Sequence, residues 1–157
     1  MQRLWAPWRE SFILGKKEKG CLFCKRTKTK NNTGHYILYR GKNCFVILNL
    51  YPYNTGHLLV VPNRHIGSLE DLTDQEAQEL MTLSAKSISA LRSALKPEGF
   101  NLGMNLARAA GAGIADHVHI HIVPRWSGDT NFMPILAGTK VLSLKLKTVY
   151  AKLKKAF

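Results

Sequence analysis

The sequence has no apolar run long enough to cross a membrane and too few cysteines for a secreted disulfide framework. Its apolar stretches, such as the run from Phe45 to Leu50, are far shorter than the roughly 20 residues of a membrane-spanning helix. Residues 1–9 contain no secretory apolar core. The 3 cysteines are an odd number and include one close pair. These absences favour a single cytoplasmic globular domain over residues 1–157.

Acidic residues are scarce at both ends of the chain, whose formal net charge is +13. Residues 1–30 hold nine Lys or Arg and two acids, and residues 140–157 hold six Lys and no acid. Residues 31–139 hold eight of each sign and are neutral. Basic termini are typical of solvated tails, but they also attract polyanions. Nucleic acid therefore stays open as a partner, although the neutral middle of the chain does not favour it.

Periodicity predicts a meander of antiparallel strands with helices packed on it. The strands are expected at residues 36–39, 43–50, 57–61, 101–106 and 117–123. A capping box at Thr73 and Glu76 predicts the start of a long helix, which apolar residues at three- and four-residue steps continue to Leu95. The same spacing predicts a C-terminal helix between Leu142 and Phe157. The segment 25–34, which is rich in Lys, Thr and Asn, is predicted to be a loop.

Three histidines alternate with apolar residues in the last predicted strand. The alternation places His117, His119 and His121 on one face. Three imidazoles are costly to bury unless each ring finds a partner for its donor and its acceptor. The pattern therefore favours a functional row over a strand that happens to carry polar side chains. The row is interpreted as a three-histidine metal site, as a nucleophilic histidine with two supporting ones, or as one metal ligand with one nucleophile.

The cysteine pair helps to choose between these alternatives. Cys21 and Cys24 have the spacing of half a tetrahedral zinc site. His65, which follows a predicted strand, and His117 are the candidates for the other two ligands. A redox pair and two buried thiols remain alternatives for the cysteines.

A zinc role for the first histidine leaves the next two free for chemistry. A neutral imidazole at His119 is a good nucleophile toward an α-phosphorus, and His121 is then placed to contact the phosphoryl oxygens. The turn at residues 109–113, with Gly111 and Gly113, offers backbone N–H groups to the same oxygens.

The segment from His117 to Val123 resembles the alternating signature of the histidine triad superfamily of nucleotide hydrolases and transferases. Asn49 before a turn, the run from Gly56 to Val60, and Asn105 ahead of the glycine turn agree with it. The likeness covers about residues 20–126. The flanking segments 4–9, 103–106 and 124–132 resemble the prokaryotic branch that is akin to dinucleoside polyphosphate hydrolases and phosphorylases and lies near the fragile-histidine-triad enzymes.

This resemblance implies an α+β fold with a five-stranded antiparallel sheet, one long helix and a C-terminal helix. It also implies a homodimer. Residues 20–126 would form the core of the domain, residues 1–19 an N-terminal extension, and residues 127–157 a C-terminal extension that contains a helix.

The resemblance further implies a role for each matching residue. The implied catalytic residues are His119 as nucleophile with His121 and His117. The implied substrate contacts are Asn49, His57, Asn105, Gly111, Gly113 and Arg125. The implied zinc ligands are Cys21, Cys24, His65 and His117.

The activity implied is cleavage of a dinucleoside polyphosphate at an α-phosphate through a nucleotidyl-histidine intermediate, with water or phosphate as acceptor. Removal of an adenylyl group from nucleic-acid ends and nucleotide binding without turnover are the alternatives. One departure stands out, because many members carry Gly-Gln followed by Ser or Thr before the triad. Residues 111–116 of this chain provide neither the amide nor the hydroxyl.

Overall fold

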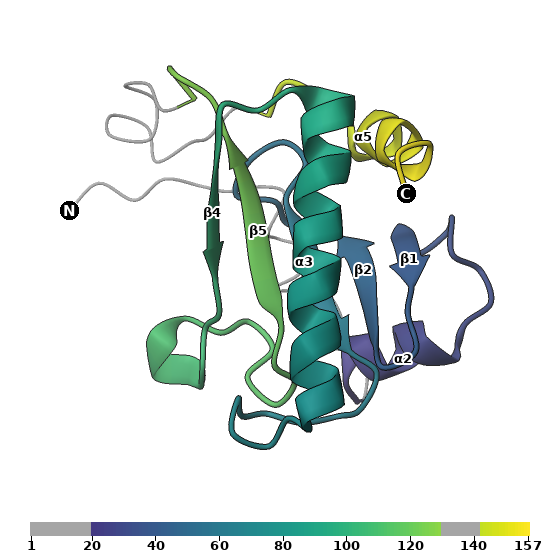
Figure 1. Ribbon diagram of the computed structural model, residues 1–157, viewed down its shortest axis with the longest axis vertical. Coiled ribbons are helices and arrows are strands. Elements are labelled where there is room, and N and C mark those ends of the chain that lie inside the picture. Colours follow the sequence, from purple (N-terminus) through teal and green to yellow (C-terminus); the bar gives the residue numbers. More distant parts are fainter. Residues whose placement is uncertain (1–19, 130–141) are drawn as a thin grey trace.

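The computed structural model describes residues 20–129 and 142–157 and contains one antiparallel sheet. Its strands are β1 (Ile37–Arg40), β2 (Cys44–Leu48), β3 (Leu58–Pro62), β4 (Gly99–Gly103) and β5 (Ile120–Arg125). Their spatial order is β1-β2-β3-β5-β4, and every neighbouring pair is antiparallel. Figure 1 shows the long helix α3 (Asp74–Leu95) crossing one face of this sheet. The predicted α+β fold with a five-stranded sheet is confirmed.

The long helix begins where its capping box predicts. Thr73 is the N-cap: its side chain accepts a hydrogen bond from the backbone N–H of Glu76, and the Glu76 carboxylate accepts one from the N–H of Thr73. The same carboxylate pairs with Arg64 at 2.7 Å. This pair ties the start of α3 to the chain that leaves β3. The helix ends at Lys96, whose backbone is left-handed.

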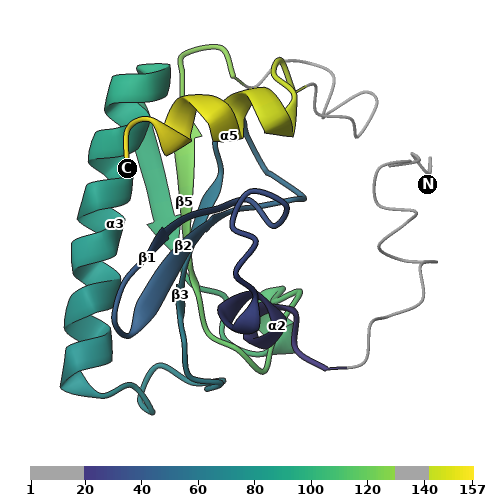
Figure 2. The same ribbon diagram turned by 90° about the vertical axis from the view of Figure 1, so that its right-hand side faces the viewer.

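Two apolar layers hold the sheet, one on each face. The larger layer lies beneath α3 and α5 (Leu146–Lys154), which is the predicted C-terminal helix. The smaller layer lies on the opposite face beneath α2 (Leu22–Lys28), where Phe23 packs edge-on against Phe45. Figure 2 shows α3 and α2 on opposite sides of the sheet. Within the described ranges, no helix has the length and apolar character needed to cross a membrane.

Two sequence predictions about individual elements were wrong. Residues 25–28 belong to α2 and are not loop. This short helix depends on packing of Phe23 into the sheet, because isolated helices of this length are unstable in water. The last strand begins at Ile120 and not at His117. The reason is that the backbone N–H of Val118 donates to the carbonyl of Ile66, at 2.7 Å, before the ladder with the neighbouring strands begins.

Candidate active site and metal cluster

Four side chains with metal-binding atoms meet from three separate segments of the chain. Cys21 and Cys24 lie at the start of α2, His65 follows β3, and His117 precedes β5. Their ligand atoms all lie within 4.8 Å of one another. The distance is 3.3 Å from Cys21 Sγ to His117 Nδ1, 3.3 Å from Cys24 Sγ to His65 Nδ1, and 3.3 Å between the two Nδ1 atoms. The structure therefore brings together the four residues expected to bind a metal.

These separations match the edges of a tetrahedral site. Bonds of about 2.3 Å to sulfur and about 2.0 Å to nitrogen give edges of about 3.3–3.8 Å around zinc. His117 Nε2 lies 2.9 Å from the carbonyl oxygen of Pro62 and must donate to it, so Nδ1 presents a lone pair to the cluster. Burial and the neighbouring Cys21 thiol raise the pKa of Cys24, which disfavours two thiolates unless a cation lies between them. The cluster can hold a metal ion.

A second set of imidazoles forms a hydrogen-bonded relay beside the cluster. His57 Nδ1 accepts the backbone N–H of Tyr53 at 3.0 Å and the side-chain amide of Asn49 at 3.2 Å. Because these two groups donate, the proton of the His57 ring is on Nε2, which lies 2.9 Å from His121 Nδ1. His121 consequently accepts on Nδ1 and carries its own proton on Nε2. This Nε2 is buried and has no hydrogen-bond partner among the described residues.

His119 has the opposite arrangement of its ring nitrogens. Its Nδ1 lies 2.9 Å from the carbonyl oxygen of His117 and can only donate there. The unprotonated nitrogen is therefore Nε2, which keeps a free lone pair. The ring of His119 lies 4.7 Å from that of His121 and 5.0 Å from that of Phe23, measured between centroids. The two neighbouring rings thus offer one lone pair and one N–H group.

Burial keeps the relay neutral at physiological pH. Burial, with smaller contributions from the charges of His121 and His119, lowers the pKa of His57 to about 3. Burial, followed by the charge of His119, lowers the pKa of His121 to about 4. The pKa of His119 is also lowered by burial, although its bond to the His117 carbonyl opposes the shift. A neutral imidazole is the nucleophilic form, so this environment favours nucleophilic chemistry.

Both rings face one pocket, on the side of the sheet away from α3. Its polar wall includes His119, His121, Asn49, Gly111 and Gly113. Its apolar wall includes Leu22, Phe23, Ile47, Leu59 and Ile114. An apolar slot that ends at a few convergent polar groups is typical of a site for a small organic ligand. The slot suits a flat ring, and the polar end suits an anionic group.

Three of the expected substrate contacts are not among the residues that line this pocket. His57 is fully buried and contacts His121 instead. The guanidinium of Arg125 is held by the carboxylate of Asp129, at 2.7 and 2.8 Å, and by the side chain of Asn101 at 2.7 Å. Asn105 follows β4 and is not among the residues that line the pocket. The nearness of Arg125 and Asn105 to the histidine row in the sequence does not place them in the lining of the pocket.

Sequence reasoning also missed two residues that shape the pocket. The ring of Tyr53 stacks on His121 at 5.6 Å with an interplanar angle of 12°, although half of this tyrosine is exposed (50%). Phe23 separates the pocket from the cysteine cluster and contacts both His117 and His119. The only signal for Tyr53 was its place in the turn between Asn49 and His57. Phe23 was indistinguishable in sequence from an ordinary core residue.

Comparisons with known proteins identify the family of this chain. A family model described as HIT domain matches residues 30–128. The chain is 41% identical over 156 residues to the "AP-4-A phosphorylase" of Mycobacterium tuberculosis, and the match covers 94% of this chain and 80% of that protein. It is 34% identical over 101 residues to the "bis(5'-nucleosyl)-tetraphosphatase [asymmetrical]" of Schizosaccharomyces pombe, covering 64% and 55% of the two chains.

A solved structure agrees with both the fold and the cluster. The crystal structure of a "Zn-bound histidine triad family protein" from Mycobacterium smegmatis superposes with a TM-score of 0.70 and 25% sequence identity. The superposition covers 87% of this chain and 92% of that one.

Proposed function

The chain belongs to the HIT domain family of nucleotide-processing enzymes, and from that membership we propose that it cleaves dinucleoside polyphosphates at an α-phosphorus with His119 as nucleophile. The observation that carries the proposal is the pair of neighbouring rings with opposite protonation. His119 offers the lone pair of Nε2, and His121 offers an N–H group that has no partner among the described residues. A nucleophile and a hydrogen-bond donor side by side are what attack on a phosphoryl group requires.

The proposed reaction has two displacements. The Nε2 lone pair of His119 attacks the α-phosphorus, and the bond from that phosphorus to the bridging oxygen breaks. A nucleotide polyphosphate leaves as an anion, and an adenylyl-histidine remains when the substrate is diadenosine tetraphosphate. The imidazolium so formed keeps its Nδ1 proton on the carbonyl of His117. His121 Nε2 and the N–H groups near Gly111 would hold the non-bridging oxygens.

An acceptor then attacks the same phosphorus and releases His119. Phosphate gives ADP and loses a proton, so the sum for diadenosine tetraphosphate is ADP and ATP. Water gives AMP and ATP instead. The relative at 41% identity is named a phosphorylase, and this supports phosphate as the acceptor.

We propose a structural zinc ion for the cysteine–histidine cluster. Cys21, Cys24, His65 and His117 would hold it, and with four protein ligands it would fix α2 and the chain before β5 without contacting the substrate. The carbonyl of His117 would thereby be positioned for its bond to His119. Because thiolate ligands persist in reducing surroundings, we place the enzyme in the cytoplasm.

We further propose a homodimer that forms through β4. This strand lies at one edge of the sheet, and Leu102 on it is 45% exposed. Exposed edge strands are templates for pairing with a second chain. A monomeric mass in light scattering at micromolar concentration would contradict the dimer.

Incubation with diadenosine tetraphosphate, with and without inorganic phosphate, tests the activity when the products are separated by chromatography. ADP with ATP only in the presence of phosphate is the expected result, and AMP with ATP would establish water as the acceptor. His119→Ala should form neither product and no adenylylated protein in intact-mass measurement. His35→Ala is the matched control, since His35 belongs neither to the cluster nor to the residues that line the pocket. Absence of cleavage by the unmodified protein would contradict the proposal.

A further inference from the structure

The loop that leads into the histidine row carries Arg108, whose side-chain contacts differ from those of every other arginine described. Five of the six described arginines contact a fixed group within the protein. These contacts are Arg26 with His35, Arg40 with backbone carbonyls, Arg64 with Glu76, Arg92 with the Phe100 ring, and Arg125 with Asp129. The side chain of Arg108 has no hydrogen bond, ion pair or ring contact within the described part of the chain. It is also exposed.

The local backbone links Arg108 to a residue that lines the pocket. Arg108 begins the short 3-10 helix η1 (Arg108–Ala110), and its carbonyl accepts a hydrogen bond from the N–H of Gly111, which lines the pocket. The residue before it, Ala107, has φ 64° and ψ 171°, a conformation that only glycine adopts easily. Such strained conformations are found mainly where a functional geometry requires them.

The composition of the loop leaves Arg108 as its one source of side-chain hydrogen bonds to a phosphate. Between Asn105 and His117, the other residues are apolar, glycine or the carboxylate of Asp116, which repels anions. The space beside Gly111 and Gly113 is open, because a Cβ at either position would meet no atom within 4 Å, and this leaves room for a ligand beside the arginine.

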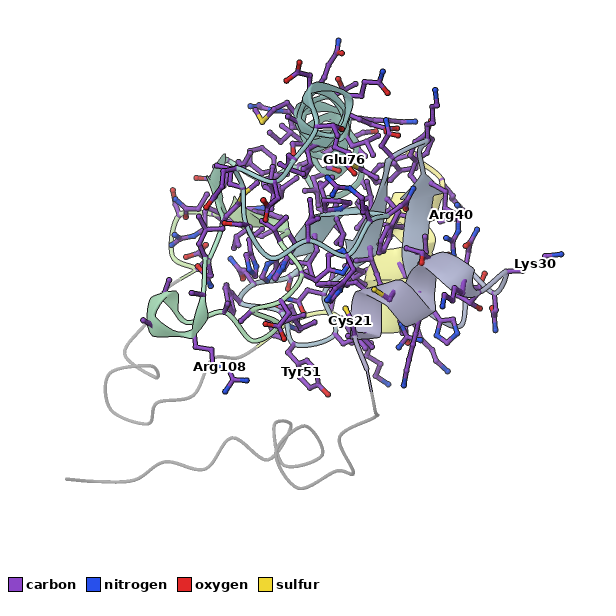
Figure 3. All side chains as sticks on the ribbon, turned by 90° about the horizontal axis from the view of Figure 1, so that it is seen from below. Cys21, Lys30, Arg40, Tyr51, Glu76 and Arg108 are labelled. Atoms are coloured by element: carbon purple, nitrogen blue, oxygen red, sulfur yellow. The ribbon has the colours of Figure 1, made fainter. Side chains whose placement is uncertain are left out.

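The direction of the Arg108 side chain agrees with a role at the pocket. Figure 3 shows Arg108 and Tyr51 extending on the side of the molecule opposite α3, the side on which the pocket lies. Tyr51 lines the pocket from the loop after β2, and Gly111 lines it from the loop of Arg108. Arg108 therefore extends on the same side of the molecule as a residue of the pocket wall.

We propose that Arg108 binds the phosphates on the leaving-group side of the reacting phosphorus. It would hold the departing polyphosphate in the first displacement and the incoming phosphate in the second, since both occupy the same side. A guanidinium suits this task because it is always charged and binds phosphate oxygens through two parallel N–H groups. The inference rests on the proposed function and names the residue that makes this site select polyphosphates.

The test compares two substrates that share the adenylyl group and differ in the leaving group. Diadenosine tetraphosphate releases a polyphosphate, whereas adenosine 5'-phosphorimidazolide releases only imidazole. The readout is the ratio of the two kcat/KM values. Arg108→Ala should lower this ratio about 10- to 100-fold, because a hydrogen-bonded charge contributes that much. Arg108→Lys should lower it less, since the charge is kept and the paired N–H geometry is lost.

Lys147→Ala on α5 is the matched control, because it removes the same charge from an exposed position that does not line this pocket. It should leave the ratio unchanged. The acceptor arm repeats the adenylyl transfer from the phosphorimidazolide at rising phosphate concentration, where Arg108→Ala should raise the KM for phosphate. An unchanged ratio in Arg108→Ala overturns the inference and leaves the proposed function intact. An unmodified protein that cleaves neither substrate overturns both.

Discussion

The histidine row serves two sites that differ in how their lone pairs are arranged. At the cluster, His117 Nδ1 faces two sulfur atoms and a second ring nitrogen, all of which are electron-pair donors. Such a set of donors suits a cation. At the pocket, every lone pair but one accepts an N–H, and the exception is Nε2 of His119. In both His117 and His119 one ring nitrogen donates to a backbone carbonyl, so the two proposed roles differ in what the remaining lone pair faces: the cysteine cluster for His117 and the pocket for His119.

The largest effect should come from removing the reactive lone pair. His119→Ala should lower the kcat of diadenosine tetraphosphate cleavage by at least about 10³-fold, because no other described group offers a free nucleophilic nitrogen to the pocket. Zinc content should not change, since Ala leaves all four cluster ligands in place. Steady-state kinetics and elemental analysis of the same preparation measure both. Loss of zinc in this variant would show that the two sites are not separable.

Removal of a cluster ligand should affect the stability of the fold more directly than the chemistry of the pocket. Cys24→Ser should reduce zinc content from one ion per chain to a small fraction and lower the free energy of unfolding by several kcal/mol, because metal binding contributes directly to folding. Elemental analysis and denaturant titration measure the two quantities. Cys44→Ala is the control, because Cys44 is buried and is not one of the cluster ligands. This variant should keep the zinc content of the unmodified protein. Full zinc content in Cys24→Ser would contradict the proposed ligand set.

A smaller effect is expected from breaking the relay that fixes the proton of His121. His57→Leu removes the N–H that His121 Nδ1 accepts at 2.9 Å, so the His121 proton is no longer held on Nε2. The kcat/KM should fall about 10- to 100-fold with zinc content unchanged. Tyr53→Phe is the control, because it keeps the backbone N–H that His57 accepts. Equal activity of His57→Leu and the unmodified enzyme would show that the relay has no role in positioning His121.

The sequence predicted the cluster better than the pocket, for a physical reason. Metal ligands and alternating imidazoles are rare residue types whose spacing alone restricts what they can do. The apolar wall of the pocket uses residues such as Ile47 and Leu59, which read in the sequence as ordinary strand residues. Arg125 is the opposite case: it lies near the motif along the chain, but its side chain pairs with Asp129 and does not line the pocket.

The fold was predictable where local signals agree with tertiary packing. The capping box placed the start of α3 correctly because Thr73 and Glu76 satisfy backbone groups within one turn. Helix α2 escaped prediction because its stability comes from Phe23 in the core and not from its own polar sequence. The conformation at Ala107 could not be predicted either, since nothing in a run of small residues marks a positive φ.

The smallest expected effect is that His57 and His121 do not titrate near neutral pH. Because burial lowers the pKa of His57 to about 3 and that of His121 to about 4, both rings should stay neutral, with the proton on Nε2, from about pH 8 to about pH 6. Long-range ¹H–¹⁵N spectra of the imidazoles measure the tautomers directly, and the urea-unfolded protein, whose rings titrate near the ordinary value of 6.5, is the control. The unfolded rings take up protons first as the pH falls. The stability that neutral burial contributes is therefore fully present above about pH 6.5 and is lost progressively toward about pH 4. If the His121 resonances shifted to the doubly protonated form near pH 6.5, the Nδ1 lone pair of His121 would not be accepting the N–H of His57. The two sites would then differ only in that one of them is a metal cluster.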